Sequence, residues 1–262
     1  MTRFDRDTEP EPLSEGRYRI GFDPGWFVIR GPNGGYVAAV LARALRAEVG
    51  PERPLRSLTV HYLAAPAAGR AEATVRVERS GRTMTFASVR CEQGGRTVAL
   101  ALAALGGAFP PAVDYHDVEM PGAPPPEELG APQPWTGPGG GPEFAERFDY
   151  LPVGSPPFRS APRAQTLGWI RLREPRPIDE AALVALADAW WPAPYMVVER
   201  FFAAPTIDLT VHLRAPLPRE HDYVLIEVRS DSARDGYFEE DVRLFHRDGT
   251  LLAHGRQLAL AL

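Results

Sequence analysis

The sequence predicts an α+β fold made of two repeated units, each a helix packed on an antiparallel sheet. The first observation is a repeat: SLTVHYLAAP at residues 57–66 returns as DLTVHLRAP at 208–216, which is 151 residues later. The second is that a helical pattern precedes each copy. The third is that alternating apolar and polar residues follow each copy, over 73–105 and 222–262, as expected for strands.

The first predicted helix covers residues 34–48. Asn33 is a favourable N-cap, and Gly50 is a common stop after a helix. The helix begins with Gly34-Gly35, which cost helix stability but let a backbone or a ligand approach unpaired N–H groups. This start, Asn33 to Tyr36, is therefore a candidate substrate-binding segment. The alternative is that the glycines only let the helix pack closely on its own sheet.

The second predicted helix covers residues 179–190. Asp179 or Pro177 opens it and Pro192 closes it. Its residues are apolar over a wide arc, and Asp188 continues one of the apolar stripes. A carboxylate there is either solvated at the helix end or buried and paired, because an unpaired buried charge is too costly.

The strands and the segment between the repeats predict the domain organisation. Each strand block ends in a hairpin whose turn contains glycine, at Gly94-Gly95 and at Asp248-Gly249. Residues 107–142 are so rich in Pro and Gly that neither helix nor strand is expected to persist in them. We therefore expect an N-terminal unit at 1–108, a linker at 109–142 and a C-terminal unit at 143–262.

Composition argues against several classes of function. The formal net charge is −5 and no run of five like charges occurs, so neither nucleic-acid binding nor membrane binding is indicated. The apolar stretch 97–109 is shorter than the ~20 residues that span a bilayer. Without an apolar secretory segment at the N-terminus, we expect a cytoplasmic protein. The single cysteine, Cys91, cannot form an internal disulfide, and strand alternation predicts that its thiol is buried and inert.

Common catalytic and metal-binding motifs are missing from the sequence. It contains no G-x-S-x-G, which disfavours an α/β-hydrolase, and neither H-E-x-x-H nor paired CxxC, so no metal or other cofactor is expected. His61, His212 and His254 are interpreted as structural or surface residues. Trp190 and Trp191 are expected to close the core, with a wall of an acyl tunnel as the alternative.

Five segments together resemble the TesB-like acyl-CoA thioesterases, which have a double hotdog fold: GPNGGYVAAVLARAL, LTVHYLAAPAAG, LADAWWP, PTIDLTVHLRAP and LAHGRQLAL. The resemblance implies that fold and an acyl-CoA substrate. In that family an Asp on the second helix, a Thr opening the following strand and a Gln on the last strand hold the attacking water. The matching residues here are Asp188, Thr206 and Gln257. Pro192 soon after Asp188 and the long Pro/Gly segment depart from the family pattern.

The residues around Thr206 and Gln257 can be interpreted without the resemblance. Gln257 shares a strand face with small residues, which leaves room for a water or a substrate oxygen; a surface glutamine is the alternative. Thr206 follows Pro205 and starts a strand. Regular alternation places its side chain opposite the face that packs on the helix, and a simple strand starter is the alternative.

The function expected is hydrolysis of a fatty or aryl acyl-CoA thioester by direct attack of water. Asp188 would act as the general base or as an acceptor that orients the water, Thr206 and Gln257 would position the same water, and backbone N–H groups at a helix start would stabilise the oxyanion. The alternatives are a catalytically silent acyl-CoA-binding or accessory protein, and a hotdog hydratase or dehydratase. The latter needs an Asp/His pair at the helix entry, and 31–48 contains no Asp-x-x-x-x-His. The expected partner is the acyl-CoA substrate, and a homo-oligomer is compatible with the sequence.

Overall fold

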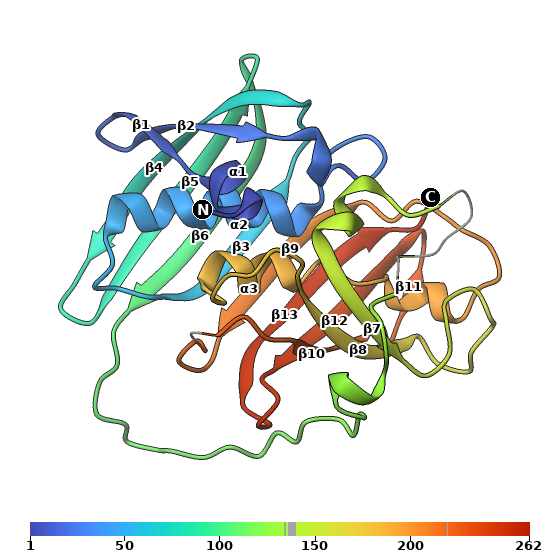
Figure 1. The fold of residues 1–262 in the computed structure, drawn as a ribbon. Helices are drawn as coiled ribbons and strands as arrows, with labels where there is room; N and C mark the ends of the chain where they lie inside the picture. The colour runs from blue at the N-terminus through green and yellow to red at the C-terminus, as the bar shows by residue number, and fades with distance from the viewer. Residues whose placement is uncertain (134, 136–139, 219) are drawn as a thin grey trace.

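One antiparallel sheet of 13 strands runs through the computed structural model, which describes residues 1–133, 135, 140–218 and 220–262 (Figure 1). The strand order is β1-β2-β4-β5-β6-β3-β9-β13-β12-β10-β8-β7, with β11 paired to β12. The first half contributes β1 (Glu11–Ser14), β2 (Arg17–Phe22), β3 (Leu55–Tyr62), β4 (Gly69–Ser80), β5 (Met84–Gln93) and β6 (Arg96–Gly106). The second contributes β7 (Phe148–Val153), β8 (Gln165–Leu172), β9 (Thr206–Leu213), β10 (Val224–Arg229), β11 (Ala233–Arg234), β12 (Tyr237–Phe245) and β13 (Leu251–Leu260).

The two halves join at β3 and β9, the strands that carry the sequence repeat. Thr59 lies directly opposite Thr210, and their hydroxyl oxygens are 3.0 Å apart. These two threonines are 151 positions apart and occupy equivalent places in the repeat, so a pseudo-twofold axis passes between them. The pairing covers what would otherwise be an exposed strand edge in each half. The two halves therefore share one continuous sheet.

The helices lie together across the centre of the sheet, and α2 packs against α3 (Figure 1). Helix α2 (Gly34–Val49) matches the prediction to within one residue: the Asn33 side chain accepts a hydrogen bond from the Tyr36 N–H, and Gly50 ends the helix at φ 87°. The remaining helical segments are α1 (Arg3–Thr8), α3 (Glu180–Leu186), and the 3-10 turns η1 (Pro24–Trp26), η2 (Pro126–Glu128), η3 (Glu143–Arg147) and η4 (Ala193–Met196).

Helix α3 ends four residues before the predicted end at 190. Pro192 cannot donate to the Asp188 carbonyl, and its ring disfavours helical backbone at the preceding residue. The Asp188 carbonyl instead accepts a hydrogen bond of 2.8 Å from Asn33 Nδ2. The chain thus leaves the helix where Asp188 reaches the start of α2.

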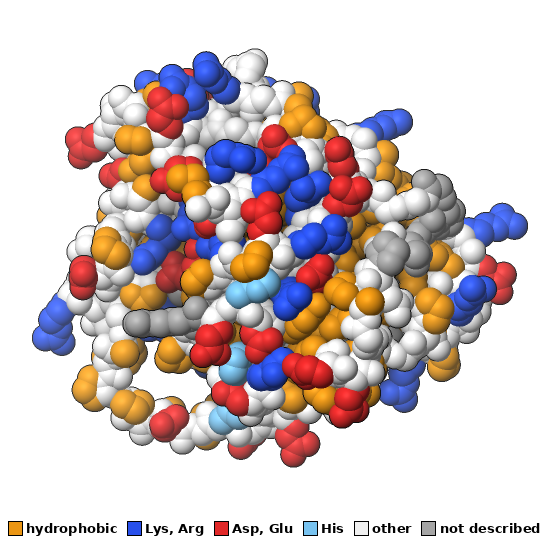
Figure 2. All heavy atoms as spheres, viewed as in Figure 1, with side chains coloured by type: hydrophobic (Ala, Val, Ile, Leu, Met, Phe, Trp, Pro, Cys, Tyr) orange, Lys and Arg blue, Asp and Glu red, His pale blue; other side chains and the backbone are white. Residues whose placement is uncertain are grey.

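The start of α3 is occupied by ion pairs. Arg43 lies 2.7 Å from the N-cap carboxylate of Asp179, and Arg46 lies 2.9 Å from Glu180. Glu180 also accepts a hydrogen bond of 2.9 Å from the Leu55 N–H. Figure 2 shows basic and acidic side chains intermingled over the helices on this face of the molecule. Each of these contacts joins an element of the first half to one of the second.

The segment at 109–142 does more than connect the two halves. Its described residues include one 3-10 turn, η2, and a single bridge between Gln133 and Tyr150. Met120 and Leu129 pack on a small apolar cluster that contains Trp169. Trp135 stacks on the Trp191 ring with centroids 5.2 Å apart. Residues 137–139, part of the stretch interpreted as linker, lie outside the described residues, and the predicted division into 1–108, 109–142 and 143–262 stays a prediction.

Candidate active site

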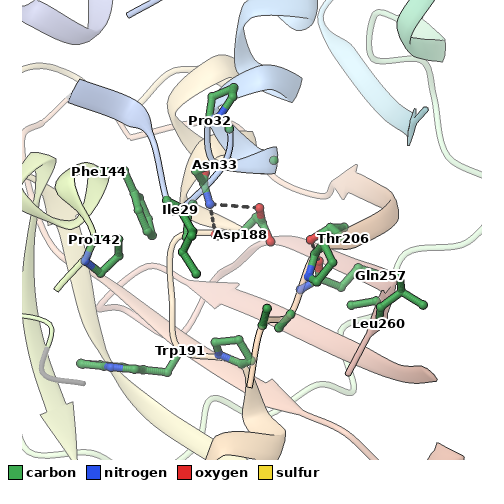
Figure 3. A pocket seen from close by; sticks show the side chains of 18 of the residues that line it. Ile29, Pro32, Asn33, Pro142, Phe144, Asp188, Trp191, Thr206, Gln257 and Leu260 are labelled. Atoms are coloured by element: carbon green, nitrogen blue, oxygen red, sulfur yellow. Dashed lines mark hydrogen bonds between the residues drawn. The ribbon is translucent and has the colours of Figure 1, made fainter. Parts of the chain in front are cut away.

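A cavity of about 1000 Å³ opens between the start of α2, the turn after α3, and strands β9, β12 and β13. Its walls are mainly apolar, and the charged residues that line it are Arg30, Asp188 and Glu240. Asp188, Thr206 and Gln257 all line this cavity, as do Asn33 and Gly34. Figure 3 shows Asn33 reaching Asp188, with Thr206 and Gln257 beside it. The aromatic residues of the wall are Tyr62, Trp135, Phe144, Phe158, Trp190, Trp191, Tyr195, Phe201 and Phe238.

Asp188 is bound to the start of α2. Its Oδ2 accepts hydrogen bonds from the Gly35 N–H at 2.7 Å and from Asn33 Nδ2 at 3.1 Å. Burial raises the pKa of Asp188 to about 6, against hydrogen bonds from Gly35, Gln257 and Asn33 that favour the ionised form. The carboxylate is half-buried and held by hydrogen bonds from the start of α2, so it is not simply solvated at the helix end.

The two glycines explain how the helices come so close. A Cβ on Gly34 would lie 2.9 Å from Asp188 Oδ2, and one on Gly35 would lie 2.7 Å from the Ala185 carbonyl oxygen. Real Cβ atoms essentially never approach other atoms at such distances. Glycine at both positions lets the start of α2 meet the end of α3, and it also leaves the Gly34 backbone at the cavity wall.

Thr206, Gln257 and Glu240 form a chain of hydrogen bonds across three strands. The Thr206 hydroxyl donates to Gln257 Oε1 at 3.0 Å, and Gln257 Nε2 donates to Glu240 Oε2 at 2.7 Å. The Ala193 N–H donates to Glu240 Oε1. The three strands thereby hold a hydroxyl, an amide and a carboxyl group in a fixed order along one wall.

A β-bulge corrects the expected direction of Thr206. The pairing of β9 with β13 shifts register between Leu258 and Ala259, so that Ala259 pairs with Thr206 and Ile207 is skipped. One extra residue in a strand turns the side chains beyond it to the other face. Thr206 therefore faces the helices and the cavity, on the same side as Gln257, instead of the opposite face that regular alternation predicts.

Tyr36, an expected substrate-binding residue, lies outside the set of residues that line the cavity. Its ring stacks on Trp26 with centroids 4.7 Å apart, and its hydroxyl donates to the carbonyls of Asp7 and Gly21. These contacts hold α2 against the first-half sheet. The side chain points away from the helix end because the first turn places it on the buried face of α2. Gly35 likewise contributes through its bond to Asp188, not as a wall of the cavity.

Glu240 is the residue of this site that sequence reasoning missed. It is 2% exposed, and burial together with the nearby Asp188 charge raises its pKa to about 8, against hydrogen bonds from Ala193 and Gln257. A signal was present: in β12 the buried positions alternate, and Phe238 and Val242 flank Glu240 on the same face. A carboxyl group at the centre of an apolar strand face indicates a functional or paired group.

Other candidate groups lie elsewhere. The rings of His212 and His254 stack with centroids 5.0 Å apart, on strand positions that alternate with the buried ones. The Cys91 thiol is buried, which raises its pKa to about 12. Within the described ranges, no cluster of three His, Cys, Asp or Glu side chains could hold a metal ion. No helix in that part of the chain is long and apolar enough to cross a membrane.

Comparison with known proteins places these features in context. Two family models match, described as the acyl-CoA thioesterase N-terminal domain, over residues 22–106, and C-terminal domain, over residues 121–261. A hot dog protein of unknown function from Alicyclobacillus acidocaldarius superposes with a TM-score of 0.93 at 24% identity, covering 100% of this chain and 98% of that one. A proposed thioesterase II from Thermobifida fusca YX gives a TM-score of 0.84 at 30% identity and the same coverage. Acyl-CoA thioesterase II TesB2 from Mycobacterium marinum gives 0.80 at 21% identity, covering 99% and 98%. No match is found among curated proteins.

The shared sheet and the paired helices define a double hotdog protein, as expected from the sequence. Both halves of the chain match thioesterase domains, and the C-terminal model alone covers more than half of its length. The chain belongs to the acyl-CoA thioesterase family, and the resemblance to its TesB-like members is confirmed.

Proposed function

We propose that this protein hydrolyses acyl-CoA thioesters by direct attack of a water molecule held between Asp188 and the Thr206–Gln257 pair. The observation that carries the proposal is the meeting of these three side chains in one apolar cavity, although they come from three separate elements. The family match supports the thioester as the substrate. The half-buried carboxylate of Asp188 supports hydrolysis, because its pKa of about 6 lets it take a proton near neutral pH.

Asp188 acts as the general base. The hydrogen bonds from Asn33 and Gly35 both fall on Oδ2, and Oδ1 carries neither of them. A pKa raised to about 6 by burial keeps the carboxylate ionised at neutral pH and makes it more basic than an exposed aspartate. Oδ1 is the oxygen that takes the proton of the attacking water.

The reaction then runs without a covalent enzyme intermediate. The hydroxide adds to the thioester carbon while Asp188 holds the proton, and the carbonyl oxygen becomes an oxyanion. The Gly34 N–H stabilises that oxyanion: it lies at the α2 start, whereas the Gly35 N–H is committed to Asp188 and the Tyr36 N–H to Asn33. Collapse of the intermediate breaks the C–S bond, and the proton passes to the departing thiolate. The products are the free acid and CoA.

The acyl group occupies the apolar part of the cavity. A volume of about 1000 Å³ walled by Trp135, Phe144 and Trp191 accommodates a fatty or an aryl chain. Trp190 and Trp191 are buried in the core, and both also line the cavity. They would therefore close the core and form part of the wall around the acyl group.

The test is turnover of a panel of acyl-CoA thioesters by wild type and variants. Asp188→Asn keeps the shape and the hydrogen bonds but removes the basicity, so kcat should fall by roughly 10²–10⁴-fold while acyl-CoA still binds. Gln257→Ala should cost less, because a second water replaces part of the amide. Asp231→Asn, an exposed carboxylate paired with Arg229, is the matched control and should keep full turnover. A wild type without turnover of any acyl-CoA would instead identify a silent binder. An Asp188→Asn chain that binds poorly but turns over normally would make this residue a binding group.

A further inference from the structure

Glu240 has no obvious structural reason to be a carboxylic acid. It lies on the inner face of β12, where its neighbours Phe238 and Val242 are apolar and buried. Within the described residues, no Arg, Lys or His lies within 4.0 Å of its carboxylate to form an ion pair. A buried carboxyl group without a cation is costly, and an apolar side chain of similar size would pack there without that cost.

The hydrogen bonds of Glu240 connect it to the proposed water site. Its Oε2 accepts from Gln257 Nε2 at 2.7 Å, and Gln257 lies directly opposite Glu240 in the β12–β13 register. Its Oε1 accepts from the Ala193 N–H at the start of η4. One oxygen of the carboxyl group is thus held by the Ala193 backbone, and the other accepts from the Gln257 amide.

An acceptor at this position decides which way the Gln257 amide points. The two ends of an amide differ only in donor and acceptor character, and above its pKa of about 8 the Glu240 carboxylate is ionised and can only accept. The amide nitrogen must therefore face Glu240, and Oε1 must face Thr206. The Thr206 hydroxyl then uses its hydrogen on Gln257 Oε1 at 3.0 Å, which leaves the lone pairs of Thr206 Oγ1 available as acceptors.

We propose that Glu240 is a positioning residue that fixes the orientation of the Gln257 amide and thereby makes Thr206 Oγ1 an acceptor for the attacking water. This inference rests on the proposed hydrolysis. With the second proton of the water on Thr206 and the first on Asp188, an oxygen lone pair of the water is left free to attack the thioester carbon. Without Glu240, the amide can rotate by half a turn and present N–H groups to Thr206. The hydroxyl then turns its hydrogen toward the water and competes with the productive geometry.

The test is a double-mutant cycle on steady-state hydrolysis of an acyl-CoA that the wild type turns over. The chains are wild type, Glu240→Met, Gln257→Ala and the double variant Glu240→Met/Gln257→Ala. Asp241→Asn, an exposed carboxylate on the same strand that lies 3.6 Å from Arg256, is the matched control. At about pH 9, where Glu240 is ionised, Glu240→Met should lower kcat on the order of 10-fold with little change in KM, since one charge-assisted hydrogen bond that orients the amide is lost. The double variant should be no slower than Gln257→Ala, because Glu240 acts only through that amide.

A conservative variant separates positioning from packing. Glu240→Gln keeps the volume and one acceptor, so it should retain more turnover than Glu240→Met. In the Gln257→Ala background this difference should vanish if Glu240 acts through the amide, whereas a packing role would preserve it. If Glu240→Met does not fold, the same double-mutant cycle is measured with Glu240→Gln in its place, and it tests the inference in the same way. Additive losses in the cycle, or full turnover by Glu240→Met, would overturn the inference and leave the proposed function intact. A wild type without turnover would overturn the proposed function and this inference with it.

Discussion

The buried Glu240 carboxyl group should make the stability of this protein depend on pH. Its pKa of about 8 lies above its ordinary value of 4.5, so the folded chain keeps a proton that the unfolded chain releases. The stability from this proton is fully present below pH 4.5 and is lost as the pH rises through 8. At about 1.4 kcal/mol for each pH unit between the two values, the loss reaches about 5 kcal/mol as an upper bound.

Replacing Glu240 by Gln removes this titration while it keeps the side-chain volume. The groups that face Glu240 are Asp188 after α3, Tyr195 in η4 and Glu239 beside it in β12, and all of them remain in the variant. We therefore expect the free energy of unfolding of Glu240→Gln, relative to wild type, to rise by several kcal/mol between pH 5 and pH 8 and then level off.

Urea unfolding at fixed ionic strength between pH 5 and pH 9 measures this difference directly. Asp241→Asn is again the control, and its curve should run parallel to that of the wild type, because an exposed carboxylate exchanges little free energy on folding. If the free energies of unfolding of wild type and Glu240→Gln differ by the same amount at every pH, Glu240 does not have a raised pKa in the folded chain. The predicted pH dependence of stability is then refuted.

Three further predictions concern the site itself. Gly35→Ala should lower stability by about 1–3 kcal/mol and reduce kcat, because the new Cβ would lie 2.7 Å from the Ala185 carbonyl oxygen and push α3 away; thermal unfolding that matches wild type would contradict this. Trp135→Ala should raise KM for long or aryl acyl-CoA and spare short chains, since Trp135 stacks on Trp191 in the cavity wall; equal effects on all chain lengths would argue against that wall as the acyl site. The value of kcat/KM should fall as the pH drops through about 6, where Asp188 takes up a proton, and a flat profile from pH 5 to pH 8 would count against Asp188 as the base.

The fold was largely predictable because its signals are local and repeated. The strand alternation, the N-cap at Asn33 and the stop at Gly50 each report a short-range preference that the structure keeps. The repeat then indicated that β3 and β9 are equivalent, and equivalent edge strands can pair across a twofold axis. The end of α3 was mispredicted because Asp188 makes its contacts to Asn33, which is far away in the sequence.

The site was only partly predictable, because several of its residues are positioned by contacts with residues far away in the sequence. Asp188 and Gln257 carried a signal because a polar side chain among apolar or small neighbours is unusual. Thr206 lines the cavity through a bulge that depends on the pairing with β13, which alternation within β9 cannot reveal. Glu240 stands between other acidic residues in the sequence FEED, a pattern typical of a solvated strand. Trp135 comes from a segment whose composition indicates only a loop.

The contrast between the starts of the two helices bears on how a duplicated chain can diverge. In a symmetric dimer of one-unit chains, a substitution at a helix start changes both equivalent positions at once. In a fused pair, the position at Asn33 and the position at Asp179 accumulate substitutions independently. The start of α2 could then keep a cavity beside it, while the start of α3 acquired ion pairs with Arg43 and Arg46. Titration of such a chain with a tightly binding, non-hydrolysable acyl-CoA analogue should therefore give one binding site per polypeptide, although its architecture has two equivalent positions.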